Sequence, residues 1–412
     1  MKNTVISIFL LFLTALPGWA GSVMPPVPEL NCRAAVLMDY ETGTELFSLN
    51  PEESIPPASM TKLMTSYLLF EKIKAGEISL DDIYTVTEAA DYRNAPPGSS
   101  LMFLGRGQRL TVKELVTGLL VVSGNDAATA VAELVAGSRD ACVRLMNEKA
   151  AELGFSFHFE DVSGYDERNS VNPQEFCRFC RLYIQICYDI FSETAGAATF
   201  SYPLKKHFNG TSPVYGTIVQ KNTNELLGRF PGVDGLKTGY IDESGYNVAL
   251  TAERNGMRLV AVIMGIDAKR SSEGKMLRAI DGSSLLTYGF SAFTTFTPAP
   301  AEKAEIPVYF SDRKTAAVVP VVDYKVTIPY SRLGELVFDC RFGSDLKGAL
   351  PAGTEVGTYS LMLGDDKIGE GAMVLAENTG RCSFWGNITE FFRSLQKKSV
   401  AERKISAIIL QL

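Results

Sequence analysis

A hydroxyl and an amine stand three residues apart where a helix is predicted to begin. Pro56 and Pro57 restrict the backbone just before Ser59, and proline is favoured at a helix start because the N–H it lacks is not needed there. Apolar residues then recur at helical spacing at Leu63, Met64, Tyr67 and Leu68. Since residues three apart lie on the same side of a helix, Ser59 and Lys62 are expected to share one face.

This pair of side chains has a chemical use. A serine hydroxyl becomes a good nucleophile when a neighbouring base takes its proton, and an unprotonated lysine one helical turn away can act as that base. Lysine is normally charged, so the fold must disfavour the proton on Lys62. We expect two contributions: the positive end of the helix dipole, and a second cation that the fold brings close.

A polar tripeptide is predicted to lie between two helices further along the chain. Thr111 and Glu114 form a capping box that begins the first of these helices. The helix ends at Ser123-Gly124-Asn125, and a second helix follows from Asp126 to Val135, with Gly137 after it. Two apolar helices can hold such a tripeptide so that its side chains face a cleft in fixed positions.

The chain as a whole predicts two folded domains, because 412 residues exceed the length of one ordinary domain. Residues 31–291 combine several helices with strand-like runs at 247–252 and 257–265, which indicates an α+β domain built on an antiparallel sheet. Residues 292–304 are predicted to be a linker. Short Val-rich and Thr-rich strands in residues 305–383 then predict a small all-β domain.

Both ends of the chain differ from these domains. Residues 1–20 have the pattern of a signal peptide, with Lys2, a short apolar run and small residues at its end, so we expect export to the periplasm or the outer face of the cytoplasmic membrane. Residues 384–412 are predicted to be an amphipathic anchor on a membrane surface. One helical face there is apolar, and basic residues lie nearby; its members are Trp385, Ile388, Phe391, Phe392 and Leu395. The alternative is a helix packed on its own domain.

Composition excludes several classes of function. A net charge of -7 argues against a nucleic-acid-binding protein. Cys177, Cys180 and Cys187 have a spacing that metal ligands can have, but they lie among apolar residues at helical spacing, and we interpret them as buried. No metal ion and no cofactor are expected. A Ser-His-Asp hydrolase is also disfavoured, because neither His158 nor His207 accompanies a Gly-x-Ser-x-Gly motif.

Three short motifs together carry a family resemblance. Ser59-Met-Thr-Lys62, Ser123-Gly-Asn125 and Lys237-Thr-Gly239 match, in this order, the motifs of penicillin-binding proteins and class A β-lactamases. The longer runs Ala58–Thr65, Ser123–Ala128, Asn222–Leu227 and Val233–Gly239 resemble low-molecular-mass penicillin-binding proteins of the D-alanyl-D-alanine carboxypeptidase family. The resemblance implies a penicillin-binding, β-lactamase-like transpeptidase domain, then a small β domain and an amphipathic tail.

The resemblance also implies roles for the motif residues. Ser59 would attack the carbonyl between the two terminal D-alanines of a peptidoglycan stem pentapeptide, and Lys62 would be its base. Lys237 would be the second cation and would help to hold the anionic substrate. Ser123 would pass a proton to the leaving nitrogen, and Asn125 would bind the substrate backbone. β-Lactam antibiotics would acylate Ser59 and act as covalent inhibitors.

Further roles concern substrate binding. Backbone N–H groups of Ser59 and Tyr240 would form the oxyanion hole, and Thr238 would bind the terminal carboxylate. Gly239 would leave room for the substrate beside the strand. Arg270 is matched to the family's arginine after the last long strand, with an ordinary surface arginine as the alternative. Ile241 stands where the family commonly has threonine, which leaves substrate detail open.

Three other functions are alternatives to the carboxypeptidase. A DD-endopeptidase of peptidoglycan cross-links would use the same chemistry. A β-lactamase is disfavoured, because residues 161–173 contain Glu167 but no Glu-x-x-Leu-Asn run. A non-catalytic wall-binding module is disfavoured because all three motifs are intact.

Overall fold

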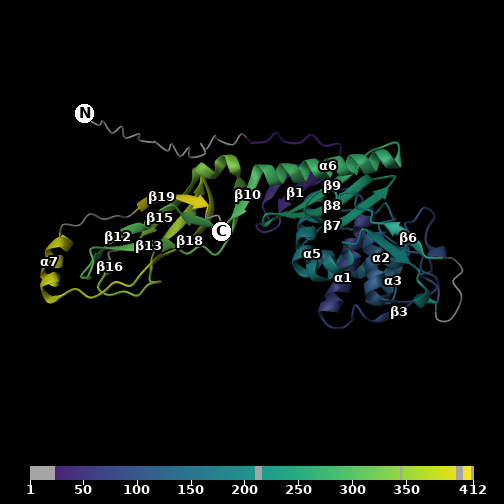
Figure 1. Cartoon of the computed structure of the whole chain (residues 1–412), viewed down its shortest axis with the longest axis horizontal. Helices are drawn as coiled ribbons and strands as arrows, with labels where there is room; N and C mark the ends of the chain where they lie inside the picture. The colour runs from purple at the N-terminus through teal and green to yellow at the C-terminus, as the bar shows by residue number, and fades with distance from the viewer. Residues whose placement is uncertain (1–23, 209–215, 344–345, 396–401, 410–412) are drawn as a thin grey trace, which may run out of the picture.

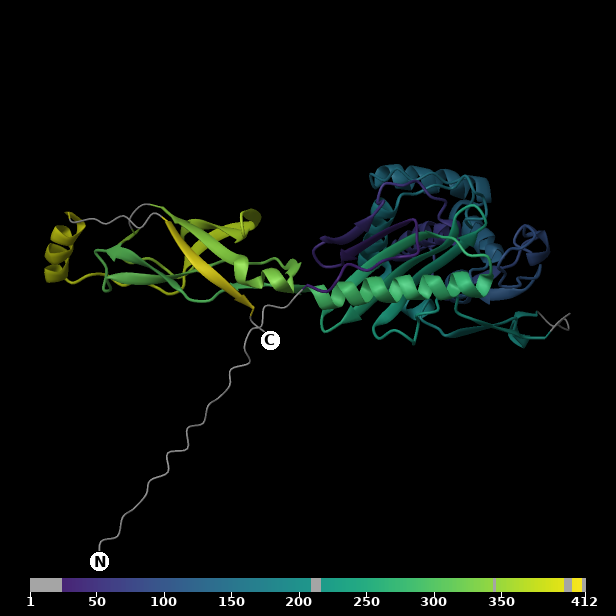
Figure 2. The ribbon, with the colours of Figure 1, turned by 90° about the horizontal axis from the view of Figure 1, so that it is seen from above.

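The protein is described from a computed structural model, which describes residues 24–208, 216–343, 346–395 and 402–409. The predicted signal peptide of residues 1–20 lies outside these described residues. Two domains follow one another along the long axis of the molecule, and helix α7 lies at the far end of the second domain (Figures 1 and 2).

A five-stranded antiparallel sheet forms the centre of the first domain. Its strands, in spatial order, are β2 (Glu45–Leu49), β1 (Ala34–Asp39), β9 (Met257–Ile266), β8 (Gly245–Arg254) and β7 (Val233–Ile241). The strand-like runs at 247–252 and 257–265 are confirmed as parts of β8 and β9. Every residue of β1 and β9 is buried, so both faces of the sheet are covered. Figure 1 shows α6 (Ser271–Ala292) on one face and α5 (Pro173–Thr194) on the other.

Three more helices lie on the α5 side of the sheet (Figure 1): α1 (Lys62–Lys74), α2 (Val112–Val121) and α3 (Asn125–Ala136). Helix α4 (Arg139–Glu152) packs against α3 and α1. The capping box predicted at the start of α2 is confirmed: the Glu114 N–H donates to Thr111 Oγ1 over 3.1 Å, and the Thr111 N–H donates to Glu114 Oε2 over 3.0 Å. Gly137 ends α3 with a φ of +79°, in the left-handed conformation that glycine adopts most easily.

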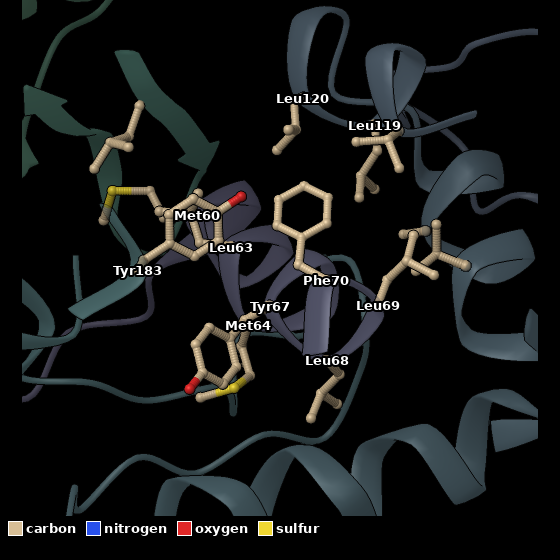
Figure 3. Close-up of a cluster of buried hydrophobic side chains, with 14 of the residues drawn as sticks. Met60, Leu63, Met64, Tyr67, Leu68, Leu69, Phe70, Leu119, Leu120 and Tyr183 are labelled. Atoms are coloured by element: carbon tan, nitrogen blue, oxygen red, sulfur yellow. The ribbon is translucent and has the colours of Figure 1, made fainter. Parts of the chain in front are cut away.

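Helix α1 is buried along most of its length. Every residue from Lys62 to Phe70 is buried, so α1 has no solvent-exposed face there. Figure 3 shows Tyr67 and Phe70 of α1 packed with Tyr183 of α5 and with leucines of α2. Burying each of these large side chains contributes about 1.5–3 kcal/mol. The core therefore fixes the start of α1, where Ser59 and Lys62 lie.

Short elements complete the domain. They are the 3-10 turns η1 (Ala58–Thr61), η2 (Tyr92–Asn94) and η3 (Lys205–His207), the pair β3 (Ile83–Thr85) and β4 (Arg109–Thr111), and the pair β5 (Thr199–Tyr202) and β6 (Ile218–Lys221).

The second domain is built almost entirely of strands. An eight-stranded sheet has the order β11-β19-β15-β17-β18-β13-β12-β16, and β10 pairs separately with β14. The strands are β10 (Phe293–Phe296), β11 (Pro298–Pro300), β12 (Ala304–Tyr309), β13 (Thr315–Pro320), β14 (Val326–Pro329), β15 (Leu336–Phe342), β16 (Leu346–Lys347), β17 (Glu355–Leu363), β18 (Asp366–Leu375) and β19 (Glu402–Ile409), with the 3-10 turn η4 (Tyr330–Glu335).

Two boundaries of this domain differ from the sequence prediction. Residues 292–304, predicted to be a linker, contain β10 and β11, which pair with β14 and β19. Part of the predicted tail, residues 384–412, also belongs to the sheet, because β19 pairs with β15 and places buried Ile405 opposite Phe338. The pairing gives the backbone N–H and C=O groups of these segments their hydrogen-bond partners. A local sequence pattern does not reveal such pairing, because the partner strands lie far away in the sequence.

Helix α7 (Phe384–Leu395) presents apolar side chains to the outside. Trp385 is 77% exposed and Phe391 is 55% exposed. The helix is held to the β domain by Arg393, whose Nη2 donates to the Lys314 carbonyl over 2.9 Å and whose guanidinium lies over the Tyr309 ring. Within the described residues, no helix is long and apolar enough to cross a bilayer.

Three threonines, two carboxylates and a lysine join the two domains. Thr295 Oγ1 donates to Asp39 Oδ2 over 2.8 Å, and Thr42 Oγ1 lies 2.9 Å from Thr327 Oγ1. Lys325 and Glu41 form an ion pair of 3.3 Å beside them. We call these six residues the polar joint. They link the end of β1 and the turn after it to β10 and β14.

The cysteines are all free thiols, and six of the seven are buried. Cys177, Cys180 and Cys187 lie along the buried side of α5, as interpreted from the sequence. Burial raises the pKa of the Cys187 thiol to about 12, so this side chain behaves as a small apolar residue.

Candidate active site

Ser59 and Lys62 meet where η1 passes into α1. The Lys62 Nζ lies 2.9 Å from Ser59 Oγ, so the structure brings together the two side chains that the spacing predicts to share a face. Ala58, just before Ser59, has a φ of +50°. A non-glycine residue in this region is strained, and such strain is concentrated at functional sites.

Lys62 has two further partners from other parts of the chain. Its Nζ lies 2.7 Å from Asn125 Oδ1 and 2.7 Å from the Ser163 carbonyl oxygen. A neutral amine has two N–H donors and one lone pair. It can therefore donate to Asn125 and Ser163 while its lone pair accepts the Ser59 hydroxyl proton, which is the arrangement that a general base requires.

The surroundings of Lys62 lower its pKa to about 7. Burial is the largest cause, because it disfavours the charged form, while the nearby carboxylates of Asp161 and Asp126 act in the opposite direction. The pKa of Lys237 is lowered well below its usual value by burial and then by the charges of Lys62 and Arg278. The sequence reasoning attributed the unprotonated Lys62 to the helix dipole and a second cation, whereas burial is the main cause.

Ser123 and Asn125 flank the start of α3, for which Gly124 is the N-cap. Ser123 has a φ of +64°, and its side-chain oxygen is buried with no hydrogen-bond partner among the described residues. A buried hydroxyl without a partner is costly, so it is available to a bound group. Asn125 Nδ2 donates to Ser99 Oγ over 3.0 Å.

The Lys237-Thr238-Gly239 segment lies within β7, against the turn that carries Ser59. Lys237 is 1% exposed, and its Nζ donates to the Thr238 carbonyl over 3.0 Å. A Cβ atom at Gly239 would lie 2.6 Å from the Pro57 carbonyl oxygen and 3.2 Å from the Ser59 nitrogen. Gly239 is thus needed so that β7 can approach η1, a different reason from the room for substrate that the sequence suggested.

Arg278, and not Arg270, is the arginine that contacts this strand. The Arg270 side chain is 80% exposed and lies 3.9 Å from Glu273. In contrast, Arg278 is 4% exposed. Its Nη1 lies 3.4 Å from the Gly239 carbonyl, and its Nη2 pairs with Glu225 at 2.6 Å. Both arginines lie after β9. Arg270 was matched from the sequence because it lies closer to the end of that strand, whereas the structure places Arg278 against β7.

An open cleft of about 650 Å³ lies beside these groups. Its walls come from three segments and two single residues, with both neutral and charged side chains: Pro97–Ser100, Gly164–Arg168, Tyr240–Glu243, Ser59 and Asn125. The exposed Tyr240 ring lies 4.3 Å from the Tyr246 ring between centroids. No group of three or more His, Cys, Asp or Glu side chains in the described part of the chain is arranged to hold a metal ion.

Sequence reasoning missed the turn that carries Ser163. Gly164, the next residue, has a φ of +81°, and a Cβ there would lie 1.7 Å from the Ala58 carbonyl oxygen. Asp161 accepts hydrogen bonds from this turn, including one of 2.6 Å from the Gly164 N–H. The Asp-x-Ser-Gly sequence at 161–164 indicates a turn, but nothing in that pattern indicates that a carbonyl of the turn meets Lys62.

Comparison with known proteins places this arrangement in a family. The family profile described as D-alanyl-D-alanine carboxypeptidase matches residues 21–268. A second profile, described as the C-terminal domain of penicillin-binding protein 5, matches residues 293–381. The chain is 33% identical over 380 residues to the D-alanyl-D-alanine carboxypeptidase DacA of Escherichia coli strain K12, which covers 90% of this chain and 89% of that protein.

Solved structures agree with the sequence matches. Penicillin binding protein 5 from Haemophilus influenzae superimposes with a TM-score of 0.66 at 29% identity, covering 86% of this chain and 99% of that one. Penicillin-Binding Protein D2 from Listeria monocytogenes in a cefotaxime-bound form gives a TM-score of 0.54 at 26% identity, covering 64% of this chain and 99% of that one. The fold is thus the α+β penicillin-binding type followed by an all-β domain. The chain belongs to the peptidase S11 family of serine-type D-alanyl-D-alanine carboxypeptidases.

Proposed function

We propose that Ser59 is the nucleophile with which this carboxypeptidase removes the terminal D-alanine from peptidoglycan stem pentapeptides. The observation that carries the proposal is the 2.9 Å contact between Ser59 Oγ and a buried Lys62 whose pKa is about 7. A lysine with this pKa is substantially unprotonated at neutral pH, so it can take the hydroxyl proton.

The reaction then follows from the positions of the side chains. Ser59 Oγ attacks the carbonyl carbon between the two D-alanines, and its proton passes to Lys62 Nζ. The C–N bond breaks as the leaving nitrogen receives a proton through Ser123, whose hydroxyl has no other partner in the described structure. D-Alanine leaves and an ester on Ser59 remains. Water hydrolyses this ester and restores the hydroxyl.

The β7 strand supplies the binding groups. The backbone N–H groups of Ser59 and Tyr240 stabilise the negative charge on the tetrahedral oxygen. The hydroxyl of Thr238, with Lys237 next to it, binds the terminal carboxylate, and Asn125 binds the peptide backbone of the acyl part. The close packing of Gly239 on η1 supports this assignment, because it sets the strand beside the nucleophile.

β-Lactams are proposed to form the same ester with Ser59 and to inhibit the enzyme. The cefotaxime-bound form of the related Penicillin-Binding Protein D2 from Listeria monocytogenes supports this. Slow hydrolysis of the ester is expected, because residues 161–173 contain no Glu-x-x-Leu-Asn run of the β-lactamase type.

One experiment tests the nucleophile. Purified protein is incubated with benzylpenicillin, the adduct is located by peptide mass spectrometry, and D-alanine release from a stem pentapeptide is measured. We expect an adduct on Ser59 and D-alanine release, and Ser59→Ala should lose both. An adduct elsewhere, or none, would contradict the proposal. Rapid loss of the adduct would favour a β-lactamase, and faster cleavage of a cross-linked dimer than of the pentapeptide would favour the endopeptidase.

We also propose that the protein is exported and held on the outer face of the cytoplasmic membrane by α7. The signal-peptide pattern of residues 1–20 supports export. The exposed Trp385, Ile388 and Phe391 support the anchor, because aromatic and aliphatic side chains on one face of a helix suit the boundary of a bilayer.

A further inference from the structure

Asp161 is a buried carboxylate that the steps described above do not use. Its side chain is 6% exposed, and it lies in the segment of residues 160–169 beneath the active site. A carboxylate this deeply buried needs compensating partners. These partners show what the residue does in the fold.

The Asp161 carboxylate organises the turn that follows it. One oxygen, Oδ1, accepts from the Gly164 N–H at 2.6 Å and from Asn169 Nδ2 at 3.1 Å. The other, Oδ2, accepts from the Ser163 hydroxyl at 2.7 Å and from the Tyr165 N–H at 3.3 Å. With donors on both oxygens, the carboxylate fixes the path of residues 161–165.

This turn is also fastened to the helix that carries Lys62. Thr65 Oγ1 donates to the Val162 carbonyl over 2.6 Å, and Asn169 Nδ2 lies 3.1 Å from Thr61 Oγ1. The carbonyl of Ser163 therefore points at Lys62 Nζ and accepts its hydrogen bond of 2.7 Å. Asp161 is thus connected to Lys62 through its hydrogen bonds to the turn and through the Ser163 carbonyl of that turn.

We propose that Asp161 is a positioning residue for Lys62 in the acylation step. It holds the Ser163 carbonyl at the amine, and its negative charge stabilises the ammonium that forms when Lys62 takes the Ser59 proton. The proposal rests on the function proposed for Ser59 and Lys62. Burial alone would lower the pKa of Lys62 so far that the amine would be a weak base. A nearby carboxylate opposes this effect of burial, because it stabilises the protonated amine.

The charged groups around Lys62 are few within the described structure. Asp161 faces it from the turn, Asp126 from α3 and Lys237 from β7. Both carboxylates raise the pKa of Lys62 against the effect of burial, and Asp161 contributes more than Asp126. Asp126 has its own fixed partners, the Met102 and Leu104 N–H groups, each at 2.9 Å.

The test is the pH dependence of acylation of Ser59 by benzylpenicillin between about pH 5 and 9. In the native protein the rate constant should rise with half of its maximum near the pKa of Lys62, about 7. Asp161→Asn should move this midpoint to lower pH by on the order of one unit. It should also lower the plateau at high pH, because Lys62 becomes a weaker base.

Two matched variants separate charge from structure. Asp161→Glu keeps the negative charge, so the midpoint should stay near the native value even if the rate falls. Ser163→Ala removes one hydrogen bond to Asp161 and keeps the charge, so its midpoint should also stay in place. Asp161→Ser is a second neutral variant for the case in which Asp161→Asn does not fold, and folding is checked by circular dichroism.

The outcomes are distinct. A folded neutral variant with an unshifted midpoint, or one shifted to higher pH, would overturn the role of Asp161 while leaving Ser59 as the nucleophile. Absence of any adduct on Ser59 in the native protein would instead overturn the proposed function itself.

Discussion

Lys62 is the residue on which most of the active site converges. Its amine contacts the Ser59 hydroxyl, the Asn125 side chain and the Ser163 carbonyl, and its burial accounts for a pKa of about 7. The proposed mechanism uses the neutral form of Lys62 as the base, so it requires that protonation of Lys62 as the pH falls through 7 removes activity. The pH dependence of the enzyme therefore tests the role proposed for this side chain.

We predict that kcat/KM for D-alanine release rises with pH and reaches half of its maximum near pH 7. Lys62→Arg should abolish release at every pH in this range, because a guanidinium keeps its proton. The measurement is steady-state kinetics on a stem pentapeptide. A profile that is flat from pH 5 to 9 would show that Lys62 does not act as the base.

Gly239→Ala should reduce acylation by benzylpenicillin by about 100-fold or more, because a displacement of about 1 Å at an active site has this effect. The added methyl group would meet the Pro57 carbonyl at 2.6 Å and push β7 away from Ser59. Gly334→Ala is the matched control, since nothing lies within 4 Å of a Cβ at that position. Equal acylation rates for the two variants would contradict the proposed fit.

The sequence predicted which residues belong to the candidate site better than it predicted the contacts between them. Ser59, Lys62, Asn125 and Lys237 stand in motifs whose order is itself informative, and the structure brings them to one place. Asp161 was not predicted to take part. Its role depends on a turn from a distant segment passing under α1, and local sequence patterns carry no information on such a contact.

At the scale of secondary-structure elements, the side chain of Arg278 connects α6 to strands β7 and β8. Arg278 reaches from α6 to the carbonyls of Gly239 and Asn247, at 3.4 and 3.3 Å. It also holds Glu225 in an ion pair. A guanidinium with five donors can serve several acceptors at once, which a lysine could not do in the same geometry.

Arg278→Gln should lower kcat/KM by about 10-fold to 100-fold, because a shorter, neutral side chain loses the ion pair with Glu225 and the contacts with the two strand carbonyls. Arg270→Gln is the matched control and should stay within about twofold of the native value, since surface substitutions have small effects. Kinetics on the stem pentapeptide decide between them. A larger loss of kcat/KM for Arg270→Gln than for Arg278→Gln would instead support the role that the sequence suggested for Arg270.

Elements with a local pattern could be predicted, and elements that depend on distant partners could not. The helices α2 and α3 follow from a capping box, apolar spacing and Gly137. The strands β10 and β11 are short, and all three missed strands, β10, β11 and β19, are defined by a partner far along the chain. Strand pairing is set by tertiary context more than by intrinsic preference.

On the scale of the whole molecule, the β domain separates α7 from the catalytic domain (Figure 2). The polar joint connects the domains through short hydrogen bonds around Asp39. If α7 lies on a membrane, the cleft is held at a distance from the lipid, where the peptides of the wall can reach it.

Trp385→Glu should shift the protein from the membrane fraction to the soluble fraction, because a charge would replace a side chain that is 77% exposed on the apolar face of α7. Val321→Glu is the matched control, since it adds the same charge at an exposed apolar position of the same domain. Sedimentation with vesicles of anionic lipids measures the effect. Equal binding of both variants would reject α7 as the anchor.

Ser123 has a consequence for the stability of the entire fold. Its backbone is strained at a φ of +64°, and its hydroxyl is buried without a partner in the described structure, so the resting enzyme is less stable than its fold allows. Ser123→Gly should relieve both features and raise the free energy of unfolding by about 1 kcal/mol. The thermal midpoint should then rise by roughly 2–4 °C while D-alanine release is lost. If the native protein instead melts at a higher temperature than this variant, Ser123 does not lower the stability of the fold. The expected result would mean that this one residue provides activity at the expense of heat tolerance.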